Sequence, residues 1–418
     1  MTWDTVPNNL PGNWSDSEAV KLREVALTNA VSALRPGENI LAILGINASA
    51  SDDDALFSPV LSATFLEPPN SVITSQPYSA PIPIQQTTTV KTRLFYAGFW
   101  SPISTATFVV GAVPASSQNF VVSEIMYHPT PPTAAEAKVS SNASDYEFLE
   151  FLNTSAAALD LSQVRLTNAV VFNFSNGDPA ALVLPAGGRV VVCANLAAFQ
   201  ARYGTNNPAI RLAGVFTDNL GNGGETLTVL GRHGEMIWRF SYSDKEPWPV
   251  DADGAGYSIV LNHPTSHPAP DPALGANWRS SAGKNGAPGQ PDGMPFTLDP
   301  LGDLDGDGLL NFLEYATGSD PAVPSPSNAI SAGMRSYAVN GAIGRHVTVE
   351  FRRNLRAADV TYELQTSSNL RDWSGSSGDL VYVGTRNNGE GTATVTWRTA
   401  LAMDQEPKPF LFVRLLVK

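Results

Sequence analysis

Two stretches between residues 120 and 153 alternate apolar and polar side chains. In the first, Val122, Glu124 and Met126 share one parity, whereas Ser123 and Ile125 share the other. The second, residues 145–153, alternates in the same way and also carries acids within an apolar run. Since successive side chains of a strand point to opposite faces of a sheet, both stretches predict half-buried strands that accept a carboxylate.

The same rhythm of short apolar runs and turn residues continues to about residue 261. Further strands are predicted at 159–167, 170–174, 182–184, 189–194, 221–230, 236–242 and 256–261. A single helix is predicted at 196–203, because Asn195 can cap its first turn and Gly204 can end it. Strands at intervals of roughly ten residues, separated by turn signals, indicate a sandwich or barrel.

The flanking regions predict shorter units. Upstream, a helix is expected at 17–30, a strand at 40–46, and short strands at 71–74, 78–84, 87–95 and 105–110. Downstream, strands are expected at 346–351, 360–366, 381–383, 393–397 and 410–415. Residues 264–298 are rich in Pro, Gly, Ala and Asn, and they predict a linker or an extended wrap anchored by Trp278.

Composition supports this pattern and adds a domain count. The chain has 418 residues, 43% of them hydrophobic and only 16% charged, with 34 Gly and 32 Pro. The length corresponds to about two to four domains, and abundant turn residues favour many short strands. We expect an all-β, multi-domain protein of immunoglobulin-like sandwiches with one short loop and helix.

Charge and cysteine content exclude some classes of partner and chemistry. The net charge of −13 argues against a nucleic acid or an anionic membrane as partner. Cys193, the single cysteine, cannot form an internal disulfide, and its apolar strand predicts a buried structural thiol. The first residues lack the features of a signal peptide, and we find no apolar run of transmembrane length. Either the chain is cytosolic or its natural beginning lies upstream.

The strongest candidate for chemistry is the acidic stretch 303–314. Its residue types match the calcium loop of an EF-hand, in which oxygen ligands recur at fixed positions around a turn glycine. Gly308 stands at the turn position. The expected ligands, with Leu309 acting through its carbonyl, are Asp303, Asp305, Asp307, Leu309, Asn311 and Glu314. We therefore expect bound Ca²⁺; the alternative is an acidic surface turn without a metal.

The surroundings of this loop indicate a structural role for the ion. A helix should leave the loop and end at Gly318, but Pro295 and Pro300 prevent a helix from entering it. The loop therefore resembles a dockerin-like or thrombospondin-repeat-like calcium loop, and Asp320 is a candidate outer ligand. A single loop has no partner loop to open against, so a sensor role is not expected.

Other titratable groups give weaker candidates. His263 and His267 are four residues apart, but prolines follow both, so a shared metal is not expected. Glu147 and Glu150 fall on opposite strand faces and cannot act as a glycosidase pair. Glu124 can approach Glu150 across paired strands, although structural or surface roles are favoured for both.

Two further candidates concern bound ligands. Asp251 and Asp253 precede a glycine and suit either a second ion or, preferably, a turn. Large aromatic side chains could stack on sugar rings, although core positions are more usual for them in sandwiches. The aromatic residues considered are Trp238, Trp248, Trp278 and Tyr242.

Ordered motifs in the middle of the chain resemble a known family. The phrases SEIMYHP, EFLEFLN, LDLSQVRLT, LPAGGRVVV, NLGNGGETLTVL and DADGAGYSIVL occur in this order between Val121 and Leu261. They resemble a bacterial lamin tail domain, which implies an immunoglobulin-like sandwich. The whole arrangement is similar to large exported proteins of verrucomicrobial and planctomycete type.

Weaker resemblances complete a division into domains. Residues 34–47 resemble the closing part of a galactose-binding-like jelly roll, 78–101 a chitobiase C-terminal sandwich, and 362–373 a C-terminal sandwich of exported proteins. The expected divisions are 1–65 (jelly-roll remnant), 66–118 (small, chitobiase-C-terminal-like or fibronectin-III-like sandwich, incomplete at its start), 119–292 (lamin-tail-like domain with trailing linker), 293–328 (calcium loop and linker) and 329–418 (C-terminal sandwich).

These features predict a non-catalytic, calcium-stabilised protein of several modules at the cell surface or outside the cell, acting in adhesion, scaffolding or attachment. The chain would then be an N-terminally truncated fragment, and its partners would be polysaccharides or other surface proteins. The alternative is a glycan-binding accessory region of a secreted polysaccharide-degrading enzyme. A hydrolase is disfavoured, because the sequence carries no G-x-S-x-G, P-loop or H-E-x-x-H motif.

Overall fold

The computed structural model describes residues 76–418 apart from 97–98, 206, 326–329, 376–377 and 404–411. The chain divides into two compact units, Met1–Pro81 and Ile82–Lys418. The elements predicted at 17–30, 40–46 and 71–74, and the jelly-roll remnant at 1–65, lie outside the described residues. Within the second unit the described elements are strands with two short α-helices, which confirms the all-β prediction.

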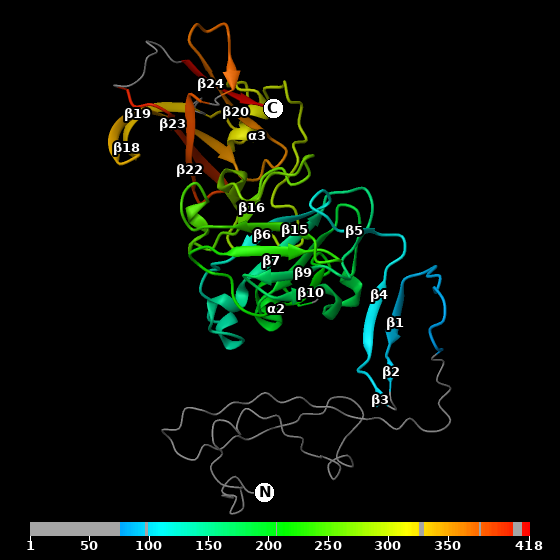
Figure 1. Cartoon of the computed structure of the whole chain (residues 1–418). Helices are drawn as coiled ribbons and strands as arrows, with labels where there is room; N and C mark the ends of the chain where they lie inside the picture. Colours follow the sequence, from blue (N-terminus) through cyan, green and yellow to red (C-terminus); the bar gives the residue numbers. More distant parts are fainter. Residues whose placement is uncertain (1–75, 97–98, 206, 326–329, 376–377, 404–411) are drawn as a thin grey trace, which may run out of the picture. The chain divides into compact units, whose positions relative to one another are not determined.

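The central sandwich, residues 113–280, contains three sheets (Figure 1). The largest has the order β13 (Leu212–Val215), β12 (Arg189–Cys193), β7 (Phe148–Asn153), β6 (Phe120–Met126), β16 (Ile259–Leu261), β17 (Trp278–Ser280). The second has the order β10 (Phe172–Asn173), β9 (Arg165–Asn168), β14 (Thr226–Leu230), β15 (Met236–Ser241). The third has the order β11 (Val183–Leu184), β8 (Leu159–Asp160), β5 (Val113–Pro114). Short 3₁₀ turns connect the strands: η2 (Glu136–Lys138), η3 (Ala143–Tyr146), η4 (Phe174–Asn176), η5 (Pro179–Ala181), η6 (Val250–Ala252) and η7 (Gly275–Asn277).

The main core of the central sandwich is aromatic and aliphatic and draws on strands of all three sheets. Phe120 stacks on Phe151 with ring centroids 5.0 Å apart. Trp278 lies 5.9 Å from both Phe240 and Trp248. Contacts of this kind supply most of the favourable free energy of folding.

The opposite face of the largest sheet carries a smaller cluster beneath a helix. Met126, Phe148 and Cys193 pack there against Phe199 of α2 (Leu196–Tyr203). The predicted helix is confirmed, with the Asn195 side chain accepting from the backbone N–H of Ala198 and with Gly204, at a φ of 97°, at its end. The prediction of a buried Cys193 is also confirmed.

The prediction that Val122, Glu124 and Met126 share one face is wrong at Val122. A β-bulge interrupts the register with β7 between Val122 and Glu124. Val122 therefore packs into the main core with Ile125, whereas Ser123 donates to Glu150 Oε1 at 2.6 Å. One extra residue in a strand reverses the parity of the residues that follow it.

Residues 264–298 do not form only a linker or wrap. They contain η7 and then β17, the edge strand of the largest sheet, which pairs with β16. Trp278 is an anchor, as predicted, but it acts from within this strand, and its indole N–H donates to Pro272 O at 2.9 Å. After the strand, residues 283–292 lie across the α2 side of the sheet as the predicted wrap, with Tyr203 Oη donating to Asn285 O.

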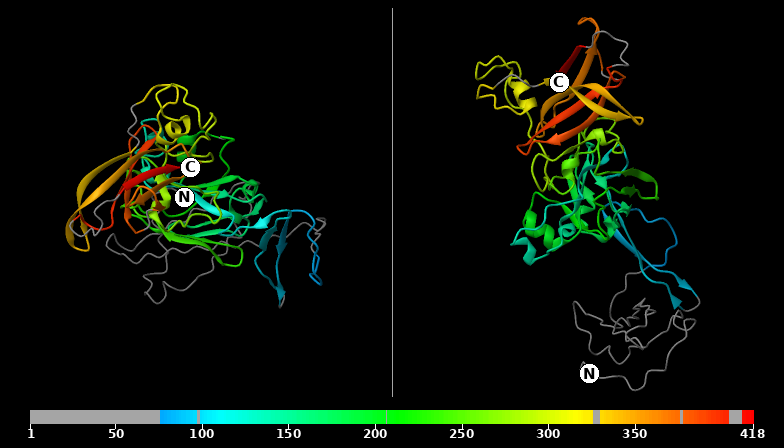
Figure 2. Two further views of the ribbon diagram at one scale, coloured as in Figure 1. Left: turned by 90° about the horizontal axis from the view of Figure 1, so that it is seen from above. Right: turned by 90° about the vertical axis from the view of Figure 1, so that its left-hand side faces the viewer.

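The C-terminal sandwich, residues 330–418, is built from two sheets (Figure 2). One has the order β18 (Ile330–Val339), β19 (Ala342–Asn354), β23 (Thr392–Thr399), β22 (Leu380–Asn387). The other has the order β21 (Ser374–Gly375), β20 (Tyr362–Ser367), β24 (Phe412–Val417). Val349, Leu364 and Val395 form part of its core. The strand β18 was not predicted, because its small and polar residues give no apolar alternation.

Residues 76–112 form less structure than the predicted small sandwich. The described elements are the antiparallel pairs β1 (Thr88–Thr92) with β4 (Ser104–Phe108) and β2 (Phe95–Tyr96) with β3 (Phe99–Trp100). The strand predicted at 78–84 is wrong, since these residues adopt no strand. Pro81 and Pro83 lack the N–H groups that a ladder requires.

A buried carboxyl group precedes β7 in the central sandwich. Glu147 is fully buried; its Oε2 accepts from Leu220 N at 2.7 Å, while Oε1 has no partner among the described residues. Burial is the largest cause that raises the pKa of Glu147 to about 8, although the hydrogen bond from Leu220 lowers it. The protonated form is therefore favoured by folding.

This shift predicts a pH-dependent stability that Glu147→Gln removes. Because the folded pKa lies above the ordinary value of 4.5, the contribution of Glu147 is complete below that value and is lost as the pH rises through 8. The loss reaches at most about 1.4 kcal/mol per pH unit in this window. Glutamine keeps the acceptor for Leu220 but cannot ionise, so urea unfolding between pH 5 and 8 should give a flatter profile.

The matched control is Glu390→Gln, because this side chain is 59% exposed. Its profile should follow that of the unmodified protein. An unchanged slope in Glu147→Gln would contradict the assignment of a buried, protonated Glu147.

Candidate functional site

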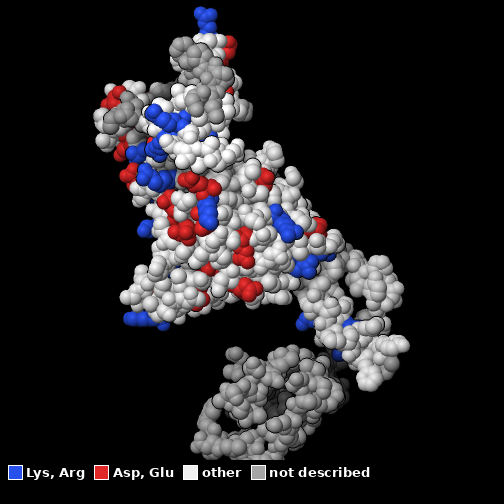
Figure 3. Space-filling model, turned by 60° about the vertical axis from the view of Figure 1, so that its left-hand side comes forward, with Lys and Arg blue, Asp and Glu red and all other residues white. Residues whose placement is uncertain are grey.

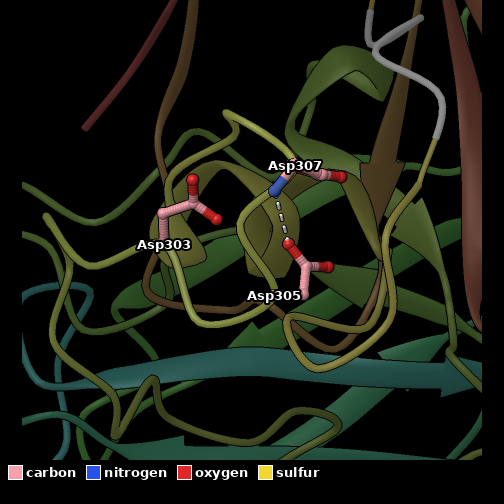
Figure 4. A group of neighbouring side chains, drawn as sticks. All are labelled: Asp303, Asp305 and Asp307. Atoms are coloured by element: carbon pink, nitrogen blue, oxygen red, sulfur yellow. Dashed lines mark hydrogen bonds between the residues drawn. The ribbon is translucent and has the colours of Figure 1, made fainter.

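The acidic stretch 303–314 folds into a loop whose backbone already binds its own carboxylates. Asp303 accepts from Gly306 N at 2.8 Å and from Gly308 N at 3.0 Å. Asp305 accepts from Asp307 N at 3.1 Å, and the two arms of the loop bring Asp303 and Asp305 opposite each other (Figure 4). Gly306 and Gly308 have φ of 76° and 92°, the left-handed region that favours glycine.

Glu314 reaches the loop from the first turn of α3 (Asn311–Thr317). It is fully buried, and neither of its carboxylate oxygens has a hydrogen-bond partner among the described residues. Burial, followed by the negative charges of Asp305, Asp307 and Asp303, raises the pKa of Glu314. An unpaired buried carboxylate is costly unless a cation compensates it.

The donor set fits a hard cation. The carboxylates of Asp303, Asp305 and Asp307 offer ligand atoms within 4.8 Å of one another. One buried oxygen of Asp305 also lacks a hydrogen-bond partner among the described residues. Carboxylate oxygens at this spacing are typical of calcium ligands. Glu314, the predicted closing ligand, feels the charges of these aspartates, but its oxygens do not lie within 4.8 Å of all of theirs.

Two predicted ligands differ in how they are placed. Asn311 Oδ1 accepts from Leu304 N at 3.0 Å, and its Nδ2 donates to Asp299 O at 3.0 Å. The Asn311 side chain therefore ties the two ends of the loop together. Leu309 donates its N–H to Asp307 Oδ1 at 2.8 Å, while the ligand role of its carbonyl stays a prediction.

One residue that closes the loop was not predicted. Ser325 N donates to Asp307 Oδ2 at 2.8 Å from beyond α3. The backbone N–H of any residue could do this, so the sequence holds no signal for it. Asp320, the candidate outer ligand, instead accepts from Ala322 N at 3.0 Å and forms a turn.

The helix that follows the loop is attached to the C-terminal sandwich. Ala316 packs with Ala357 and Val360, and Tyr362 Oη donates to Ala316 O at 2.6 Å. Asn354 Nδ2 donates to Tyr315 O at 2.8 Å. The helix ends at Gly318 in the left-handed region, as predicted. Residues that would hold a metal are thus fastened to a folded domain.

Glu124 and Glu150 do meet across paired strands, since they are register partners in β6 and β7. The expectation that they could be surface groups is wrong, because both are fully buried. Glu150 accepts from Ser123, from Arg189 Nη1 at 2.6 Å and from Gly289 N at 2.7 Å. Both carboxylate oxygens of Glu150 are therefore already hydrogen-bonded by the protein in a fully buried position.

His128 and the Asp251–Asp253 turn also form protein contacts. His128 Nδ1 lies 2.6 Å from Asp253 Oδ1, and Asp251 Oδ2 accepts from Asn387 N at 2.5 Å. Among the residues that the structure describes, three or more potential metal ligands converge only at Asp303, Asp305 and Asp307. A second ion at Asp251 and Asp253 therefore gains no support.

The aromatic side chains considered for sugar stacking lie in the core. Trp248, Trp278 and Tyr242 are buried, with exposed fractions of 7%, 1% and 2%. Trp238 is partly buried and donates its indole N–H to Phe120 O at 2.7 Å. A buried ring cannot present its face to a pyranose, so these four residues do not form a sugar platform.

Comparison with known proteins identifies the central sandwich. The family model described as Lamin Tail Domain matches residues 114–244. Neither the curated proteins nor the solved structures contain a match. In the part of the chain that the structure describes, every helix is too short or too polar to cross a membrane. The central sandwich is therefore similar to the lamin tail domain, a non-catalytic, immunoglobulin-like family.

Proposed function

We propose that this protein is a non-catalytic, calcium-stabilised protein of several modules, which acts in attachment, adhesion or scaffolding at the cell surface or outside the cell. The observation that carries the proposal is the fully buried Glu314, whose carboxylate lacks a partner among the described residues and lies beside three aspartates. A divalent cation would compensate this charge, and calcium suits the ligand types.

The residues of the chain would hold the ion in a preorganised loop. Asp303, Asp305 and Asp307 are already oriented by backbone N–H groups. Glu314 would close the site from α3 and thereby connect the loop to the helix. Since α3 packs on the C-terminal sandwich, the ion would stabilise the junction before that domain.

The proposal that the protein is not catalytic rests on the burial and hydrogen bonding of its carboxyl groups. The central sandwich is similar to a non-catalytic family. Glu124, Glu147 and Glu150 are buried in it, where protein donors occupy the oxygens of Glu150. Burial raises the pKa values of Glu124, Glu147 and Glu150, so an open active site is not needed to explain the raised values.

The rival function, a glycan-binding accessory region of a polysaccharide-degrading enzyme, loses its predicted platform. The four aromatic side chains on which it depended are in or beside the core. A glycan site would have to lie elsewhere in the chain.

Calcium should raise the melting temperature through Glu314 and Asp305. At a calcium concentration of about 100 times Kd, the stabilisation is about 2.7 kcal/mol, which corresponds to a rise of roughly 5–10 °C. The shift should vanish in Glu314→Gln and in Asp305→Asn, because each removes a ligand charge. Differential scanning calorimetry with calcium, magnesium and a chelator measures it.

Asp218→Asn is the matched control for this experiment. Asp218 is exposed and lies in the central sandwich at a φ of 68°, a conformation that asparagine tolerates. It should respond to calcium like the unmodified protein. A calcium response that survives in Glu314→Gln, or no response in the unmodified protein, would refute the metal site.

The protein should not turn over chromogenic glycosides or esters. The physical reason is that Glu124, Glu147 and Glu150 are buried, and the cavity that Glu124 and Glu150 line has a volume of only about 50 Å³. The measurement is absorbance of released nitrophenol at several pH values, with and without calcium. Turnover that disappears in a single carboxylate variant retaining its melting temperature would establish an enzyme instead.

A further inference from the structure

The C-terminal sandwich differs in charge from the rest of the chain. Residues 330–418 carry eleven Lys and Arg side chains and eight Asp and Glu side chains, although the whole chain has a net charge of −13. Basic and acidic groups lie close together on the side of the molecule seen in Figure 3. The average charge of the chain therefore does not describe this domain.

One face of the β18–β19–β23–β22 sheet is polar and hollowed. Val349 and Val395 point into the core, so their neighbours Glu350, Thr394 and Thr396 face outward. The register places Glu350 beside Thr396 and Thr394 beside Arg386. A groove of about 440 Å³ runs over this face and is lined by Arg335, Tyr337, Glu350, Arg386, Thr394 and Thr396.

The loop before η6 of the central sandwich supplies one wall of the groove. Glu246 and Val250 line it there. Gly384 of β22 makes room for this wall, since a Cβ at that position would lie 3.1 Å from Glu246 Oε1. The hydrogen bond from Asn387 N to Asp251 fastens the loop to β22.

Two arginine side chains of the groove have guanidinium N–H groups that are free to bind a ligand. Arg335 pairs with Glu350 at 2.9 Å, but the arginine side chain remains 58% exposed. Arg386 is exposed, and its side chain makes no hydrogen bond or ion pair with the described residues. Guanidinium groups bind carboxylate or sulfate groups through two parallel hydrogen bonds.

We propose that this groove binds an acidic polysaccharide. Arg335 and Arg386 would bind the carboxylate or sulfate groups of its sugar units. Thr394, Thr396 and the carboxylate of Glu246 would accept hydrogen bonds from its hydroxyl groups. A nucleic acid fits less well, because Tyr337, the aromatic ring in the groove, is half-buried against Arg398 and His346 and is poorly placed to stack on bases.

This inference names the ligand class of the attachment function and rests on that function. It does not involve the calcium loop. If the protein responds to calcium but binds no acidic polysaccharide, only the proposal for the groove is refuted. If it binds the polysaccharide but does not respond to calcium, only the proposal for the metal site is refuted.

The test measures binding of the full chain to polygalacturonate, alginate and chondroitin sulfate, with neutral dextran as reference, by affinity electrophoresis and calorimetry. Acidic polymers should bind and dextran should not, and salt should weaken the binding. The double variant Arg335→Gln/Arg386→Gln should bind at least about tenfold more weakly for each arginine removed. Both side chains are exposed, so its melting temperature should be unchanged.

Arg232→Gln/Arg371→Gln is the control, since it removes the same charge from exposed positions outside the groove. It should bind as the unmodified protein does. Binding that the control variant weakens as much as the groove variant, or no binding to any acidic polysaccharide, would overturn the proposal. Equal, arginine-dependent binding of single-stranded oligothymidylate would also overturn it, because the groove would then recognise polyanions in general.

Discussion

The described part of the chain depends on two glutamates, Glu124 and Glu150, that are buried beneath the backbone of residues 283–292. Glu124 and Glu150 face the same side of the largest sheet and accept from Ala287 N at 3.1 Å and Gly289 N at 2.7 Å. Gly286 permits this approach, because a Cβ there would lie 2.0 Å from Glu124 Oε1. Burial is the largest cause that raises the pKa of Glu124, and the charge of Glu150 adds to it. Two carboxyl groups in this position are tolerable because the wrap, together with Ser123, Arg189 and Ser258, supplies donors.

The wrap leads directly to the acidic loop. Arg279 of β17 binds Asp292 at 2.5 Å at the end of the wrap, and Met294 N then donates to Arg356 O at 2.8 Å in the C-terminal sandwich. Tyr315 of α3 donates its hydroxyl to Met294 O. Residues 283–318 therefore connect three features in sequence: the buried glutamates, the candidate calcium loop and the last domain. A cation in the loop would act on a junction that is already short and hydrogen-bonded.

Burial explains why the most perturbed acids do not suggest catalysis. A raised pKa in an open cleft is a sign of an acid or base that works on a substrate. Glu124, Glu147 and Glu150 have raised pKa values because they are buried in the central sandwich. Glu314 is different, because it is buried, has no hydrogen-bond partner among the described residues, and has its pKa raised by the charges of the nearby aspartates. The three glutamates of the central sandwich are therefore structural, whereas Glu314 suits a bound cation.

The sequence by itself determined the features that depend on a few neighbouring residues. Asn195 and Gly204 define α2, and the spacing of Asp303, Asp305, Asp307 and Gly308 defines the turn of the acidic loop, because caps and tight turns involve near neighbours. The motifs of the central sandwich also indicated its family. Only the tertiary structure decided the bulge at Ser123, the edge strand at Trp278 and the burial of Glu124 and Glu150. The groove lined by Arg335 and Arg386 also became visible only in the tertiary structure. Register and burial depend on the pairing of strands that are far apart in the sequence.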